Sequence, residues 1–61
     1  MMTIKKGDRV MYAAAWGAAA PVPGTITDNG AEHKGREAWG VRLDDGAARW
    51  GYANQFTILE G

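Results

Sequence analysis

Two arginines and three large aromatic residues are the side chains of this sequence that are best suited to binding. Arg42 and Arg49 stand on either side of an Asp-Gly dipeptide, and Trp16, Tyr12 and Trp50 supply broad aromatic rings. Two guanidinium groups brought together would hold a phosphate or a carboxylate through bidentate hydrogen bonds. Aromatic side chains are enriched where proteins contact partners. The expected chemistry is therefore ligand binding by these five residues.

Catalysis within one chain is not expected. The sequence has no cysteine and no serine, and its glycines do not reach the spacing of a phosphate-binding loop. His33 stands alone in a charged stretch, without a second histidine at metal-ligand spacing, and is expected to be solvated. Asp44 and Asp45 precede Gly46, which marks them as turn residues rather than as a pair of catalytic carboxylates. We predict no catalytic residue, no metal and no cofactor.

The length of the chain predicts one domain over residues 1–61, with its core in 6–59. A domain of this size buries only about 60% of the surface that its unfolded chain exposes. The hydrophobic fraction of 46% includes eleven alanines, which add little buried area. We therefore expect marginal stability, and association into a homo-oligomer is an open alternative to a monomer.

Charge and hydropathy restrict the partners and the location. Seven Lys and Arg balance seven Asp and Glu, so no net field attracts the chain to nucleic acid. No stretch approaches the ~20 apolar residues of a membrane span, and the first residues lack the apolar segment of a secretory signal. We expect a cytoplasmic location with no membrane contact, a protein partner or self-association, and nucleic acid only as a less favoured partner.

The elements that must position these side chains are short strands. Alternating apolar residues and turn signals indicate five strands, at 8–12, 25–28, 39–43, 48–52 and 56–59, with a single helical turn at 53–55. Residues 13–21 and 29–36 are expected to be loops. The larger apolar side chains are the predicted core: Val10, Tyr12, Ile26, Trp39, Val41, Leu43, Trp50, Tyr52, Phe56, Ile58 and Leu59, with Ile4 or Val22 at its margin.

The Asp45-Gly46 hairpin has two alternative registers. A two-residue turn would bury Trp50 and Tyr52 and place Arg42 directly opposite Arg49 on the outer face. A type I turn with a glycine bulge would instead turn Arg49 inward and Trp50 and Tyr52 outward, and would separate the arginines. We prefer the first register because it buries the aromatic rings. A nearby carboxylate that neutralises the arginines is the alternative to an anion site.

Three motifs carry a resemblance to a known fold. A Gly-Asp-Arg-Val opening strand, Gly24-Thr25-Ile26 and a Leu-Asp-Asp-Gly hairpin occur in this order. The chain thus resembles SH3-like small barrels of the Tudor, KOW and CAP-Gly kind over residues 6–59. The resemblance implies an all-β, five-stranded barrel with a one-turn helix before the last strand. It also places Trp16 in the loop that borders a peptide groove, where this residue is either a partner contact or a lid over the core.

The function expected from this resemblance is a small non-enzymatic binding or assembly module that contacts protein through an aromatic groove or a strand edge. The alternative is a KOW-like nucleic-acid-binding domain that uses Arg42, Arg49 and the Lys5-Lys6-Arg9 cluster. A more remote alternative is an oligomeric reductase, because Gly7–Val10 and Ala14-Ala15-Trp16 are faintly similar to type II plasmid-borne dihydrofolate reductases. The Val-Gln-Ile-Tyr pore segment of that family is replaced here by Ala48-Arg49-Trp50-Gly51.

Overall fold

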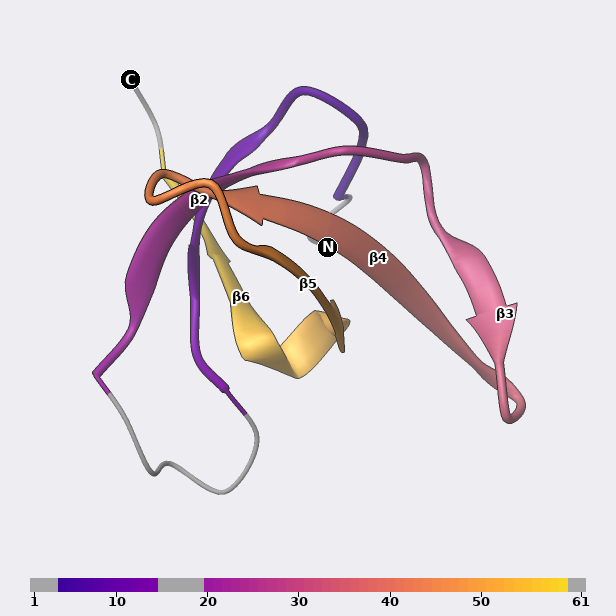
Figure 1. The fold of residues 1–61 in the computed structure, drawn as a ribbon. Helices are drawn as coiled ribbons and strands as arrows, with labels where there is room; N and C mark the ends of the chain where they lie inside the picture. The colour runs from indigo at the N-terminus through magenta and orange to yellow at the C-terminus, as the bar shows by residue number, and fades with distance from the viewer. Residues whose placement is uncertain (1–3, 15–19, 60–61) are drawn as a thin grey trace.

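The computed structural model of the chain describes residues 4–14 and 20–59, which form one curled, open antiparallel sheet (Figure 1). The sheet has six strands, and a single turn of 3-10 helix, η2 (Ala53–Gln55), precedes the last of them. The strands are β1 (Arg9–Tyr12), β2 (Val22–Ile26), β3 (Ala31–His33), β4 (Arg36–Leu43), β5 (Ala48–Tyr52) and β6 (Phe56–Ile58). The expected all-β class and the one-turn helix are confirmed.

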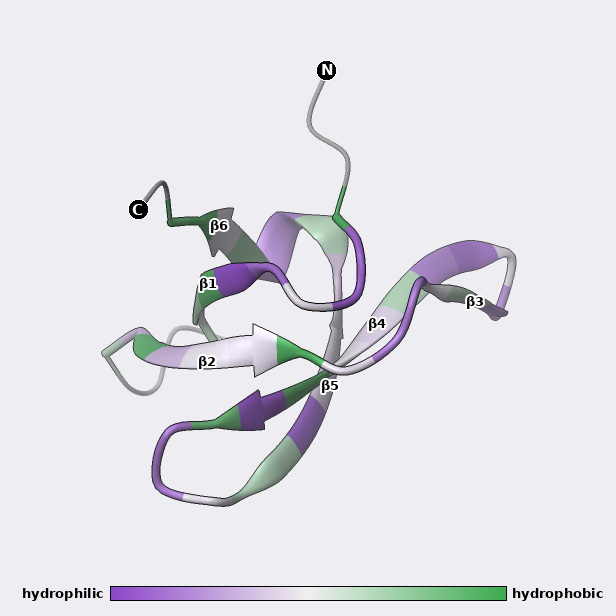
Figure 2. Ribbon diagram, turned by 90° about the horizontal axis from the view of Figure 1, so that it is seen from above, coloured by the Kyte–Doolittle hydropathy of each residue, from purple (hydrophilic) through white to green (hydrophobic). Residues whose placement is uncertain are grey.

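The central element of the sheet is β4, because it pairs with three other strands. The order along the sheet is β3-β4-β2-β1-β6, and β5 pairs with the opposite edge of β4. The first part of β4 pairs with β3 and its last part with β2, so these two strands follow each other along one edge. The β3–β4 hairpin consequently projects from the remainder of the sheet, and its tip is hydrophilic (Figure 2).

The core lies on the concave side of the sheet and is formed by residues that alternate along the strands. Its buried members are Ile4, Val10, Tyr12, Ile26, Trp39, Val41, Leu43 and Phe56. The indole of Trp39 is 7% exposed, and its Nε1–H donates to the backbone carbonyl of Ile4 over 3.0 Å. This bond joins the N-terminal segment to the core, which explains why Ile4 is a full member of it.

The expected number of five strands is wrong, because residues 29–36 are not one loop. Ala31–His33 form β3, and β4 begins at Arg36 rather than near Trp39. Lys34 and Gly35 connect the two strands, with φ angles of 52° and 79°. Two consecutive residues with positive φ form the type I′ turn that suits a two-residue hairpin. The turn was missed because lysine rarely adopts this conformation.

The preferred register of the Asp45-Gly46 hairpin is also wrong. Gly46 has a φ of 95° and donates its N–H to the Leu43 carbonyl over 2.9 Å, and the Leu43 N–H donates to the Ala47 carbonyl over 2.8 Å. This is a type I turn followed by a glycine bulge, and it pairs Gly40 with Trp50. Trp50 therefore lies outside the core, where it is 52% exposed.

The bulged register places Gly51 on the concave side in place of a large residue. A Cβ atom at Gly51 would lie 2.9 Å from Oε1 of Gln55 and 3.0 Å from a ring carbon of Tyr12. The space is needed by Gln55, whose Oε1 accepts the Tyr52 N–H over 3.0 Å and whose Nε2 donates to the Ala13 carbonyl over 3.2 Å. Gln55 thus ties the end of β5 to the end of β1.

Candidate binding surface

Three aromatic side chains cluster on the convex face of the β3–β4–β5 ribbon. His33, Trp50 and Tyr52 share this face with Ala31 and Ala38, as their register shows. The ring centroids of Trp50 lie 4.7 Å from that of His33 and 5.4 Å from that of Tyr52, both in edge arrangements. We call His33, Trp50 and Tyr52 the outer aromatic surface.

A cation already lies on this surface. The guanidinium carbon of Arg36 is 4.0 Å from the ring centroid of Tyr52, which is the geometry of a cation–π contact. Arg36 and His33 are directly opposite each other on β4 and β3, so the cation lies beside the cluster at the tip of the projecting hairpin. The outer aromatic surface is therefore able to hold a planar cation against a ring.

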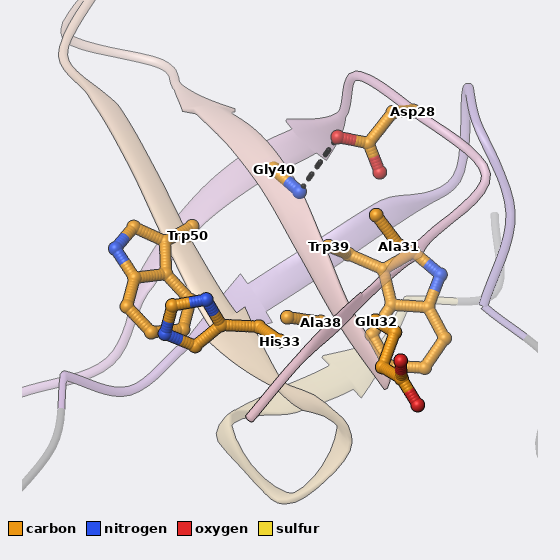
Figure 3. A pocket seen from close by; sticks show the side chains of 8 residues that line it. All are labelled: Asp28, Ala31, Glu32, His33, Ala38, Trp39, Gly40 and Trp50. Atoms are coloured by element: carbon orange, nitrogen blue, oxygen red, sulfur yellow. Dashed lines mark hydrogen bonds between the residues drawn. The ribbon is translucent and has the colours of Figure 1, made fainter. Parts of the chain in front are cut away.

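A groove of about 350 Å³ adjoins the outer aromatic surface. Figure 3 shows Trp50 and His33 on one side of the β3–β4 ribbon and Trp39 and Glu32 on the other, as the alternation of side chains along both strands requires. The small lining residues, Ala31, Ala38 and Gly40, leave the space open because they extend little above the backbone. The full set of lining residues is Asp28, Ala31, Glu32, His33, Ala38, Trp39, Gly40 and Trp50.

Asp28 closes the end of this groove and is held there by the backbone. Its Oδ2 accepts the Gly40 N–H over 3.1 Å (Figure 3). Its Oδ1 accepts the Gly30 N–H over 2.9 Å. Between β2 and β3 the pairing along this edge of β4 is interrupted. Asp28 supplies the hydrogen-bond acceptor that the Gly40 N–H would otherwise lack at this point. Its carboxylate is thereby fixed at the groove rather than free to rotate into solvent.

Four of the five binding residues expected from sequence are described by the structure, and these four are not brought together. Trp50 is exposed and lines the groove. Tyr12 is 8% exposed in the core, where its hydroxyl donates to the Trp50 carbonyl over 3.0 Å, so it does not form an aromatic wall with the Trp50 ring. Trp16, on which both the groove contact and the lid were expected, lies outside the described residues.

Arg42 and Arg49 do not form the expected cross-strand pair. Arg42 lies opposite Ala48, and Arg49 lies opposite Val41, so the two arginines emerge from opposite faces of the ribbon. The Arg49 guanidinium donates instead to the neighbouring Ala48 carbonyl over 2.9 Å. The anion clamp predicted from the two-residue turn is therefore wrong, since a one-residue change of register exchanges the faces.

Two members of the Lys5-Lys6-Arg9 cluster are paired with carboxylates. Lys5 Nζ lies 3.2 Å from Asp8, and Arg9 forms two hydrogen bonds of 2.8 Å with the two oxygens of Asp44. The hydrogen bond from Arg9 lowers the pKa of the exposed Asp44 carboxyl, helped by the attraction between the two charges. These cations are already neutralised locally, which weakens the case for phosphate contacts there.

Sequence reasoning missed most of the outer aromatic surface. Tyr52 was expected in the core, and Arg36 was not singled out for its contact with a ring. His33 is exposed as expected, yet its ring contacts Trp50. Side chains two residues apart on a strand share a face, so Ala31 and His33 lie on one side of β3 and Trp50 and Tyr52 on one side of β5. This spacing is the signal that would have found the cluster.

Comparisons with known proteins supply no family for this chain. No protein-family model matches it, and searches of curated proteins and of solved structures find no match either. Over residues 4–14 and 20–59, no helix has the length and apolar character needed to cross a bilayer. The same residues contain no cluster of three acidic or histidine side chains arranged to bind a metal.

Proposed function

We propose that this chain is a small non-enzymatic binding module that contacts a protein partner through the outer aromatic surface and the adjoining groove. The observation that carries the proposal is the exposure of Trp50, which is 52% exposed and makes edge-on ring contacts with His33 and Tyr52. Large aromatic rings that are grouped outside a core mark interaction sites, since they bury much area with few rotatable bonds.

We further propose that the curled sheet is an SH3-like barrel. Support comes from a long connection between β1 and β2, from the hairpin of β4 and β5, and from η2 immediately before the last strand. This architecture places the outer aromatic surface on the convex side of β3, β4 and β5. The core stabilises the ribbon from the concave side, and the convex side is available to a partner.

The groove is favoured over the edge of β5 as the contact site. The outward-facing carbonyls of an edge strand are acceptors for an added strand. On β5, the Trp50 carbonyl already accepts the Tyr12 hydroxyl, and the Ala48 carbonyl accepts the Arg49 guanidinium. An incoming strand would have to displace both bonds, whereas the ring of Trp50 is accessible without any rearrangement.

The proposal is tested by selecting a displayed random-peptide library on the purified chain. We expect the enriched peptides to bind Trp50→Ala at least tenfold more weakly than the unchanged chain, because the variant loses the central ring of the surface. Leu59→Ala is the matched control, since Leu59 is 38% exposed and lies outside the groove lining. Thermal unfolding of both variants checks that they remain folded.

Two results would contradict the proposed function. One is a selection from which no peptide binds the unchanged chain. The other is a set of enriched peptides that bind Trp50→Ala and the unchanged chain equally well.

A further inference from the structure

Two exposed arginines lie on the same face of the ribbon as Trp50. Side chains two residues apart on a strand share a face, so Arg36 and Arg42 lie on the convex face with Gly40, which pairs with Trp50. Neither arginine forms an ion pair with a carboxylate in the part of the chain that the structure describes. Arg36 contacts the Tyr52 ring, and such a contact does not use up the N–H donors of a guanidinium. The convex face thus presents two cations that are available to a ligand.

The carboxylates closest to this face in the chain are already bonded. Arg9 donates to both oxygens of Asp44. The Oδ1 atom of Asp45 accepts the Ala47 N–H, and each oxygen of Asp28 accepts a backbone N–H. Asp44 is therefore neutralised by a cation, and the other two carboxylates are held in place by the backbone rather than by the arginines.

The β3–β4 hairpin also separates its charges by face. His33 and Arg36 are opposite each other on the convex face, whereas Glu32 and Glu37 are opposite each other on the other face. Figure 3 shows Glu32 on the far side of the ribbon from His33 and Trp50. The backbone of the hairpin therefore lies between these two glutamates and a ligand on the convex face.

The spacing of the two arginines suits an extended polypeptide. Arg36 and Arg42 are six residues apart on β4, which separates their Cα atoms by about 20 Å. Between them, Ala38 and Gly40 lie beside Tyr52 and Trp50 on β5. A peptide in the extended conformation rises by the same distance per residue as β4. Two acidic side chains that are six residues apart therefore reach both arginines, and the side chains between them reach the rings.

From this arrangement we infer that the partner segment is extended and acidic, and that it lies along the convex face of β4. One carboxylate accepts paired N–H bonds from Arg42, a second accepts them from Arg36, and apolar side chains between them pack against Trp50. The inference rests on the proposed function and specifies its partner. A nucleic-acid strand fits less well, because its continuous phosphates would also pass Asp28, which is bonded to Gly40 between the two arginines.

A pair of peptides that differ only in charge tests this assignment. Ac-Glu-Thr-Val-Thr-Val-Thr-Glu-NH₂ places both glutamates and both valines on one face of an extended chain, and the control peptide carries glutamine in place of each glutamate. Each peptide is titrated into the full chain, with amide, indole and guanidinium N–H resonances followed by NMR. We expect the acidic peptide to shift the Trp50 indole N–H and the Arg42 Nε–H, with at least fivefold weaker binding of the glutamine peptide. Added salt should weaken the binding of the acidic peptide, because it screens exposed charges.

A matched pair of variants locates the charge. Arg42→Gln should weaken binding of the acidic peptide at least threefold, because it removes one of the two guanidinium groups, and Arg36→Gln should act in the same direction. Arg49→Gln is the control, since Arg49 lies opposite Val41 and therefore on the other face of the ribbon. It makes the same change in net charge, and we expect less than a twofold effect from it. An equal loss of binding in Arg42→Gln and Arg49→Gln contradicts the assignment of Arg42.

The remaining outcomes separate this inference from the proposed function. Equal binding of the acidic and glutamine peptides at Trp50 overturns the inference and leaves the proposed function standing. No shift with either peptide at millimolar concentration also overturns it, and the displayed library then decides the function. A dT₁₀ oligonucleotide that shifts the Trp50 indole N–H when the acidic peptide does not would replace the inference by a nucleic-acid site. Self-association of the unchanged chain that Arg42→Gln abolishes would replace it by an interface between two copies.

Discussion

At the scale of single residues, the contact between Asp28 and Gly40 holds the groove in shape. A Cβ atom at Gly40 would lie 2.9 Å from Oδ2 of Asp28 and 2.9 Å from Oγ1 of Thr27. Side chains of both residues would have to move, and the hydrogen bond from the Gly40 N–H to Asp28 would be lost. Glycine at this position therefore allows the hydrogen bond to Asp28 at the end of the β2–β4 ladder.

Gly40→Ala is expected to lower the free energy of unfolding by about 1 kcal/mol. The loss of the hydrogen bond destabilises the fold by more than the lower conformational entropy of the unfolded variant stabilises it. Urea denaturation measures this change. The double variant with Asp28→Ala is the control, because two changes that break the same bond are not additive. If the two losses simply add, Gly40 and Asp28 act independently and this account of the glycine fails.

At the scale of elements, two tight turns determine which side chains face outward. The Lys34-Gly35 turn has positive φ at both positions, and the Gly46 bulge shifts β5 by one residue relative to β4. Because successive side chains of a strand alternate, this shift moved Trp50 and Tyr52 from the expected core to the surface. The site is therefore a consequence of turn geometry rather than of strand composition.

Lys34→Asn is predicted to stabilise the chain by about 0.5–1 kcal/mol, because asparagine adopts the left-handed conformation with less strain than lysine. The midpoint of thermal unfolding checks the direction. The same replacement at Lys6, which is exposed and does not share the positive φ of Lys34, is the control and should give no gain. A loss of stability on Lys34→Asn would show that this turn does not have the described conformation.

Sequence alone predicted the elements better than it predicted their faces. Val10, Ile26, Val41 and Phe56 were placed correctly in the core because strong alternation surrounds them. The dipeptide Asp45-Gly46 fits two turns, and the preference for buried aromatic rings selected the wrong one. Nothing local in the sequence showed that Gln55 is held above Gly51, since its side chain is also bonded to Ala13 at the end of β1.

At the scale of the whole molecule, the core is too small to bury every aromatic ring of residues 4–14 and 20–59. Trp39 and Phe56 fill the concave side, where little room remains beside Tyr12. Trp50 and Tyr52 lie on a ribbon in which two carbonyls of β5 already accept side-chain hydrogen bonds. In the proposed function, a partner therefore makes side-chain contacts with the convex side of β3, β4 and β5 in place of backbone ladder bonds.

The account depends on the register of β4 and β5, and proton distances between the two strands test it most directly. Because the Leu43 N–H donates to the Ala47 carbonyl, Gly40 and Trp50 form a non-hydrogen-bonded pair, in which the two Cα atoms approach most closely. We predict a strong nuclear Overhauser effect between the Hα protons of Gly40 and Trp50. A strong effect between the Hα protons of Val41 and Trp50 instead would bury the indole and contradict the proposed binding surface.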